Sequence, residues 1–107
     1  MDKNVQRTAS YIEENLDSKL TIKSISRQVN ISKTVLYSKF HTYFGCTISE
    51  FINIRRIEKS IEFLTKTDLS MDEISLKVGF SSASYYSKIF KKLKGISPLK
   101  YKKLHSE

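Results

Sequence analysis

The sequence predicts an all-α fold of seven helices. Glycine and proline, which tight hairpin turns require, number only 3 and 1 among the 107 residues. Apolar residues recur at spacings of three and four, which is typical of one face of a helix, and no segment alternates as a half-buried strand would. Serine or threonine also stands where most of the expected helices begin. Together these observations favour helices throughout.

Residues 1–46 are expected to hold three helices. The first covers 4–16, Thr21 is suited to capping the second, and Ser32 is suited to capping the third. Gly45 is the expected end of the third helix. The apolar positions that should face a core in this segment are Val5, Ala9, Ile12, Leu16, Ile22, Ile25, Val29, Leu36, Phe40 and either Tyr43 or Phe44.

A long linker helix is expected in residues 47–66, and three more helices in 67–107. The segments TISE at 47–50 and SMDE at 70–73 have the form of capping boxes, and Pro98 after Ser97 favours the start of the last helix. The expected core positions of the linker helix are Phe51, Ile54, Ile57 or Glu58, Ile61 and Leu64. Those of the later helices are Ile74, Val78, Tyr86, Ile89, Phe90, Leu93, Leu99, Tyr101 and Leu104.

The two halves of the chain repeat one pattern of helix, tight turn and helix. Before the turn the matching residues lie 49 positions apart, and after it they lie 50 apart, so one residue is added in the second turn. Each turn contains an apolar residue, as in the helix-turn-helix motif. Hairpins used only for packing remain an alternative, although solenoids normally need three or more repeats. Before the turn the matched pairs are Leu20 and Leu69, Ile25 and Ile74, Ser26 and Ser75, Val29 and Val78, and Ser32 and Ser81. After it they are Phe40 and Phe90 and Gly45 and Gly95, and the apolar turn residues are Ile31 and Phe80.

The third and sixth helices present polar faces without acidic residues. On the third helix these positions are Thr34, Tyr37, Ser38 and His41, and on the sixth they are Ser84, Ser87, Lys88 and Lys91. Small hydroxyls and amines suit the edges of bases in the major groove. The net charge of +8 also favours a polyanionic partner. An ordinary solvated face is the alternative, although it would normally include acids.

The segment from Arg56 to Pro98 reads RIEKSIEFL, then TKTDLSMDEISLKVGFSS, then YYSKIFKKLKGISP after two further residues. With Gly79, Phe80, Phe90, Gly95 and Pro98 at matching spacings, it resembles the signature of the AraC/XylS family of bacterial transcription regulators, specifically their DNA-binding domain. The resemblance covers about residues 5–104.

This resemblance implies two helix-turn-helix units, 1–46 and 67–107, joined by the linker helix. Both recognition helices would enter successive major grooves of double-stranded DNA, which lie about 34 Å apart. The base-reading positions it implies are Thr34, Tyr37, Ser38, Ser84, Tyr85 and Lys88. The phosphate-binding positions are Ser32, Lys33, Arg55 or Arg56, Ser82 and Lys91.

The sequence departs from the family in two respects. No lysine or arginine lies between Phe40 and Gly45, so the first unit is expected to bind more weakly or mainly to position the protein. The sensing or dimerising domain that most members carry is not present in these 107 residues, so a stand-alone regulator and a piece of a larger one both stay open, as does the oligomeric state.

Other chemistry has little support in the sequence. His41 and His105 are the only histidines, and Cys46 lacks a second cysteine or histidine at metal-ligand spacing, so no catalytic residue, metal or cofactor is expected. The single cysteine suits a cytoplasmic protein, and no signal peptide or membrane span is apparent. The alternative function is a basic module that binds acidic proteins or membrane surfaces. A contact with RNA polymerase through acidic residues such as Asp68, Asp72 and Glu73 also stays open.

Overall fold

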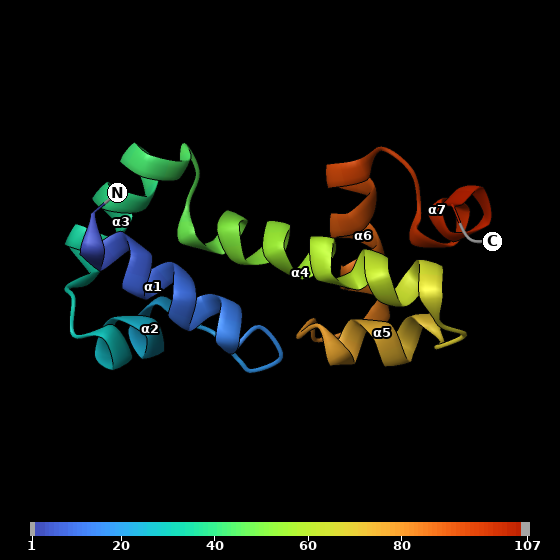
Figure 1. Ribbon diagram of the computed structural model, residues 1–107, viewed down its shortest axis with the longest axis horizontal. Coiled ribbons are helices and arrows are strands. Elements are labelled where there is room, and N and C mark those ends of the chain that lie inside the picture. The colour runs from blue at the N-terminus through green and yellow to red at the C-terminus, as the bar shows by residue number, and fades with distance from the viewer. Residues whose placement is uncertain (1, 106–107) are drawn as a thin grey trace. The chain divides into compact units, whose positions relative to one another are not determined.

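The computed structural model describes residues 2–105, and within them the chain forms seven α-helices and no strand (Figure 1). This confirms the predicted all-α class. The helices are α1 (Lys3–Glu14), α2 (Ile22–Val29), α3 (Lys33–Phe44), α4 (Ile48–Lys66), α5 (Met71–Lys77), α6 (Ala83–Lys94) and α7 (Pro98–His105).

The caps that the sequence predicted are present, whereas Asp2, which it did not predict as a cap, begins α1. The Ser32 hydroxyl accepts a hydrogen bond from the Val35 N–H at 3.3 Å, and the Ser82 hydroxyl accepts one from the Tyr85 N–H at 3.1 Å. Such bonds satisfy amide groups that have no partner inside the helix. Gly45 and Gly95, with φ of 68° and 82°, end α3 and α6 in the left-handed conformation that glycine adopts without strain. The two predicted capping boxes also form, between Thr47 and Glu50 and between Ser70 and Glu73.

The chain divides into two compact units, Met1–Ile52 and Asn53–Glu107, and each has its own hydrophobic core. In the first unit α1 packs against α2 and α3. In the second, α6 packs against α5 and α7 (Figure 1). The first core consists of Ile12, Leu16, Ile25, Val29, Leu36, Phe40, Ile48 and Ile52. The second consists of Ile57, Leu64, Ile74, Val78, Phe80, Tyr86, Ile89 and Phe90.

The predicted buried face of α4 is confirmed at Ile57 and Leu64 and differs at its other positions. Ile48 and Ile52 are buried in the first core, whereas Ile57 and Leu64 are buried in the second. The prediction assumed one continuous stripe, but α4 contributes to two separate cores and its buried positions follow both. Phe51 and Ile61 are half-buried and pack against the first and second core, and Ile54 is half-buried. Glu58, which the prediction gave as the alternative to Ile57, is exposed.

The end of the chain also differs from the prediction. Leu93, expected to face inward, has 41% of its surface exposed, and Leu99 and Leu104 are exposed by 52% and 64%. Pro98 is buried instead, and the Tyr101 ring packs edge-on against Phe90 with 5.4 Å between ring centroids. Tyr101 therefore packs α7 against the second core, and the Lys102 ammonium donates to the carbonyl of Thr67 at 3.3 Å.

The turn between the two helices has the same construction in both units. Asn30 and Gly79 have positive φ, 57° and 101°, which reverses the direction of the chain after α2 and α5. The next residue, Ile31 or Phe80, then donates its backbone N–H to the carbonyl of Ser26 at 3.2 Å or of Ser75 at 2.8 Å. The sequence paired Ser32 with Ser81, but the residue that caps α6 as Ser32 caps α3 is Ser82. Ser81 is therefore the residue added in the second turn.

Replacement of Phe90 by alanine is expected to destabilise the second unit by about 3–5 kcal/mol, because the ring is fully buried between Tyr86 and Tyr101 and its loss leaves a cavity. Leu93→Ala on the same helix is the control and should cost much less, since that side chain is 41% exposed. Urea unfolding of both variants measures the difference. Equal losses would show that the buried face of α6 is misassigned.

Candidate nucleic-acid interface

The polar faces of α3 and α6 lie on the surface of their units. Thr34, Tyr37 and Ser38 of α3 are exposed, and 52% of the Tyr37 surface is accessible to solvent. On α6 the exposed positions are Ser84, Tyr85 and Lys88. The opposite side of each helix carries a phenylalanine that is fully buried in the core, Phe40 on α3 and Phe90 on α6. The six positions predicted to read bases are therefore all accessible.

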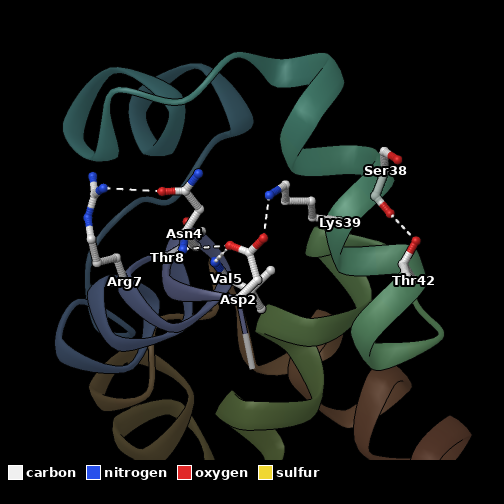
Figure 2. A network of polar contacts seen from close by, with 8 residues as sticks. All are labelled: Asp2, Asn4, Val5, Arg7, Thr8, Ser38, Lys39 and Thr42. Carbon is white, nitrogen blue, oxygen red and sulfur yellow. Dashed lines mark hydrogen bonds and ion pairs between the residues drawn. The ribbon is translucent and has the colours of Figure 1, made fainter.

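A polar network fixes α3 to the start of α1 (Figure 2). One oxygen of the Asp2 carboxylate accepts hydrogen bonds from the backbone N–H groups of Asn4 and Val5, and the other accepts one from the Lys39 ammonium. The hydrogen bond from Lys39 is the main cause that lowers the pKa of Asp2 below its ordinary value. The positive charge of Lys39 is therefore compensated within the first unit.

A buried hydrogen bond fixes α6 to α4. The Tyr86 hydroxyl donates to the Ser60 hydroxyl at 2.8 Å, and Ser60 in turn donates to the carbonyl of Ile57 at 2.7 Å. Burial raises the pKa of Tyr86 to about 12, and the hydrogen bond with Ser60 opposes this shift. The neutral phenol is thus the form that the folded protein favours. The bond joins the buried side of α6 to the buried side of α4.

Tyr85 has neighbours on two sides even though 42% of its surface is exposed. The Asn53 side-chain amide donates to its hydroxyl at 3.3 Å, and the Phe80 ring meets it edge-on with 5.8 Å between centroids. The Arg56 guanidinium lies over Phe80, 5.9 Å from the ring centroid. A residue of the linker helix and a residue of the turn therefore both hold Tyr85.

The structure distinguishes between the two arginines that the sequence offered for phosphate binding. Arg56 is buried, with 9% of its surface exposed, because it covers Phe80. This burial disfavours Arg56 as a phosphate ligand. Arg55 is half-buried and pairs with Glu58 at 3.3 Å, so its side chain reaches the surface. The remaining phosphate candidates, Ser32, Lys33, Ser82 and Lys91, are all exposed.

The structure also shows supporting residues that the sequence did not reveal. Asp2, Asn53 and Ser60 hold residues of α3 and α6 in place, yet each reaches a partner 26 to 37 positions away in the chain. No periodic pattern specifies such a pairing. The only sequence signal is positional, since a polar residue such as Ser60 on the buried side of a helix requires a hydrogen-bond partner.

Comparison with known protein families identifies residues 25–104 as a match to the helix-turn-helix domain. The chain belongs to this family and is of the AraC/XylS type. The domain is similar to the melibiose operon regulatory protein of Escherichia coli, with 31% identity over 96% of this chain and 34% of that protein. This chain spans between 8% and 36% of the lengths of the curated relatives that it matches.

Two solved structures share the fold of this helix-turn-helix domain. The C-terminal domain of AraT, a response regulator from Geobacillus stearothermophilus, superposes with a TM-score of 0.95 at 29% identity and covers 99% of this chain and 88% of that one. The DNA-binding domain of AdpA, solved in complex with a target DNA, has a TM-score of 0.87 at 19% identity, covering 92% of this chain and 89% of that one. The family is a class of DNA-binding regulator domains and not a class of enzymes. No described helix is long and apolar enough to cross a membrane.

The pKa of Tyr86 leads to a prediction about alkaline pH. Because the folded-state pKa is raised from about 10 to about 12, the stabilisation is complete below pH 10 and is lost as the pH rises toward 12. Tyr86→Phe should cost about 1 kcal/mol at neutral pH, since it removes one buried hydrogen bond. The variant should then lose less stability than the unmodified protein between those pH values. Urea unfolding at a series of pH values tests this, and parallel curves for the two proteins would contradict it.

Proposed function

We propose that this domain binds double-stranded DNA with sequence specificity through α3 and α6, as the DNA-reading part of a bacterial transcription regulator. The observation that carries the proposal is the pair of matched, acid-free helix faces, each preceded by the same turn and the same serine cap. Hydroxyl and amine groups on an exposed helix can reach donors and acceptors on base edges in the major groove.

In the second unit, α6 is the stronger DNA-binding helix. Ser84 and Tyr85 are exposed in its first turn and Lys88 is exposed at its middle, and these three are proposed to contact base edges. Lys91 in its last turn is proposed to neutralise a phosphate, as is the exposed end of the helix that Ser82 caps. The Ser82 hydroxyl accepts one hydrogen bond from the backbone and retains its own proton for a phosphate oxygen.

In the first unit, α3 is proposed to read bases with Thr34, Tyr37 and Ser38 and to bind phosphate with Ser32 and Lys33. Its electrostatic attraction is weaker because Lys39 is paired with Asp2. The two helices together are proposed to occupy successive major grooves. In that arrangement α6 would supply most of the affinity, and α3 would mainly extend and orient the contact.

The chain corresponds to about a third of the melibiose regulator, so the partners of a whole regulator are likewise proposals. A contact with RNA polymerase through the exposed acids Asp68, Asp72 and Glu73 is compatible with their position at and before the start of α5. The alternative, a basic module without sequence preference, predicts equal binding to all duplexes and to vesicles of anionic lipid.

Selection of bound duplexes from a random pool tests the proposal. A sequence-specific reader of two grooves should recover a motif with two boxes about one helical turn apart, and it should not bind anionic vesicles with comparable affinity. Recovery of unrelated sequences, or equal binding to vesicles, would favour the alternative.

Lys88→Ala is expected to weaken binding to the selected duplex by about 1–3 kcal/mol and to relax the preference at one base pair, because Lys88 is exposed on the face that is proposed to enter the groove. Lys66→Ala, which removes an exposed lysine of α4 outside both recognition helices, is the matched control and should change the affinity little. Fluorescence anisotropy with the selected and a scrambled duplex measures both. An equal loss on both duplexes would assign Lys88 to a phosphate instead of a base.

A further inference from the structure

The hydroxyl of Tyr85 has one of its hydrogen-bonding capacities occupied from within the protein. Asn53 donates its side-chain N–H to the Tyr85 oxygen at 3.3 Å. Phe80 contacts the tyrosine ring edge-on, and Arg56 covers Phe80 in turn. Asn53 and Arg56 are three residues apart, so they lie on the same face of α4. This face of the linker helix therefore holds both the turn residue and the first exposed tyrosine of α6.

A phenolic hydroxyl has one proton to donate and an oxygen that accepts. The Asn53 amide occupies the accepting side, so a second donor group that approached the same oxygen would meet an amide proton already there. The proton of Tyr85 is not given to any described residue, and 42% of the residue is accessible. The group that Tyr85 still offers to a ligand is therefore a donor.

We propose that Asn53 is a positioning residue that presents the Tyr85 hydroxyl to DNA as a hydrogen-bond donor. This inference rests on the proposed function. Its consequence is a preference for acceptors, which are a phosphate oxygen, N7 or O6 of guanine, N7 of adenine and O4 of thymine. The amino groups of cytosine and adenine are donors and are disfavoured at this position.

A double-mutant cycle on DNA affinity tests the coupling between the two residues. With the duplex recovered from the random pool, Tyr85→Phe is expected to weaken binding about fivefold to tenfold, because it removes the donated hydrogen bond. Asn53→Ala should weaken binding about twofold to fivefold by releasing the hydroxyl, and the double variant should bind no more weakly than Tyr85→Phe alone. The thermal unfolding midpoint, measured alongside, should not account for these losses, because both side chains lie at the surface.

The variant Asn53→Asp gives a sharper test because a carboxylate only accepts hydrogen bonds. The new carboxylate should accept a hydrogen bond from the Tyr85 hydroxyl, so that this hydroxyl no longer donates to DNA. The added negative charge also repels DNA, and the same substitution in the Tyr85→Phe background measures that effect alone. The loss of affinity caused by Asn53→Asp should therefore be larger in the protein that keeps Tyr85 than in the Tyr85→Phe background. The two losses should differ by about the fivefold to tenfold factor of the donated bond.

Modified duplexes identify the acceptor. If the acceptor is a phosphate, a methylphosphonate at one backbone position should abolish the difference between the unmodified protein and Tyr85→Phe. If it is a purine N7, a 7-deazapurine at one base should do so. Either result supports a donated hydrogen bond and names its source.

Three results would overturn the inference. The losses for Asn53→Ala and Tyr85→Phe could multiply in the double variant, Asn53→Ala could leave affinity unchanged while Tyr85→Phe weakens it, or Tyr85→Phe could bind normally. In each case the unmodified protein would still select a motif, so the proposed function would stand. Failure of the random-pool selection itself would refute the proposed function separately.

Discussion

The turn between the two helices of each unit is the constraint on which the exposed faces of α3 and α6 depend. A left-handed residue, Asn30 or Gly79, lets the following backbone N–H reach the carbonyl of Ser26 or Ser75. That bond fixes the direction in which the chain leaves α2 or α5. It also places an apolar side chain, Ile31 or Phe80, against the core. The serine caps then begin the next helix in a defined rotation, with Phe40 or Phe90 inward and the polar residues outward.

The two units support these faces by different means. In the first unit, a carboxylate at the start of α1 pairs with Lys39 of α3, which attaches the helix through an ion pair near the surface. In the second unit, the bond between Tyr86 and Ser60 is buried, and Asn53 and Arg56 add contacts at Tyr85 and Phe80. The second unit also keeps the lysines of its recognition helix exposed. A helix that is attached through a buried hydrogen bond and carries more exposed positive charge is suited to supplying most of the affinity.

The sequence predicted the features that local chemistry decides. Seven helices, their serine and threonine caps and the glycines at the ends of α3 and α6 follow from neighbouring residues, and the structure contains them. The exposed faces of α3 and α6 could be predicted from the sequence because Phe40 and Phe90 fix the rotation of their helices. Features that depend on partners far away along the chain could not be predicted. The buried positions of α4 required knowledge of two cores, and the burial of Arg56 depends on Phe80, 24 positions along the chain. Leu93 illustrates the same limit, because an apolar residue at the right spacing is not buried unless another element covers it.

A residue-by-residue NMR titration of the domain with the selected duplex shows which helices meet the DNA. The largest chemical-shift changes should fall on the caps and exposed faces of α3 and α6, from Ser32 to Ser38 and from Ser82 to Lys91, with smaller changes on the outer faces of α1 and α5. Changes confined to α1, α5 or α7, or present in only one of the two recognition helices, would refute the proposal that both helices read DNA.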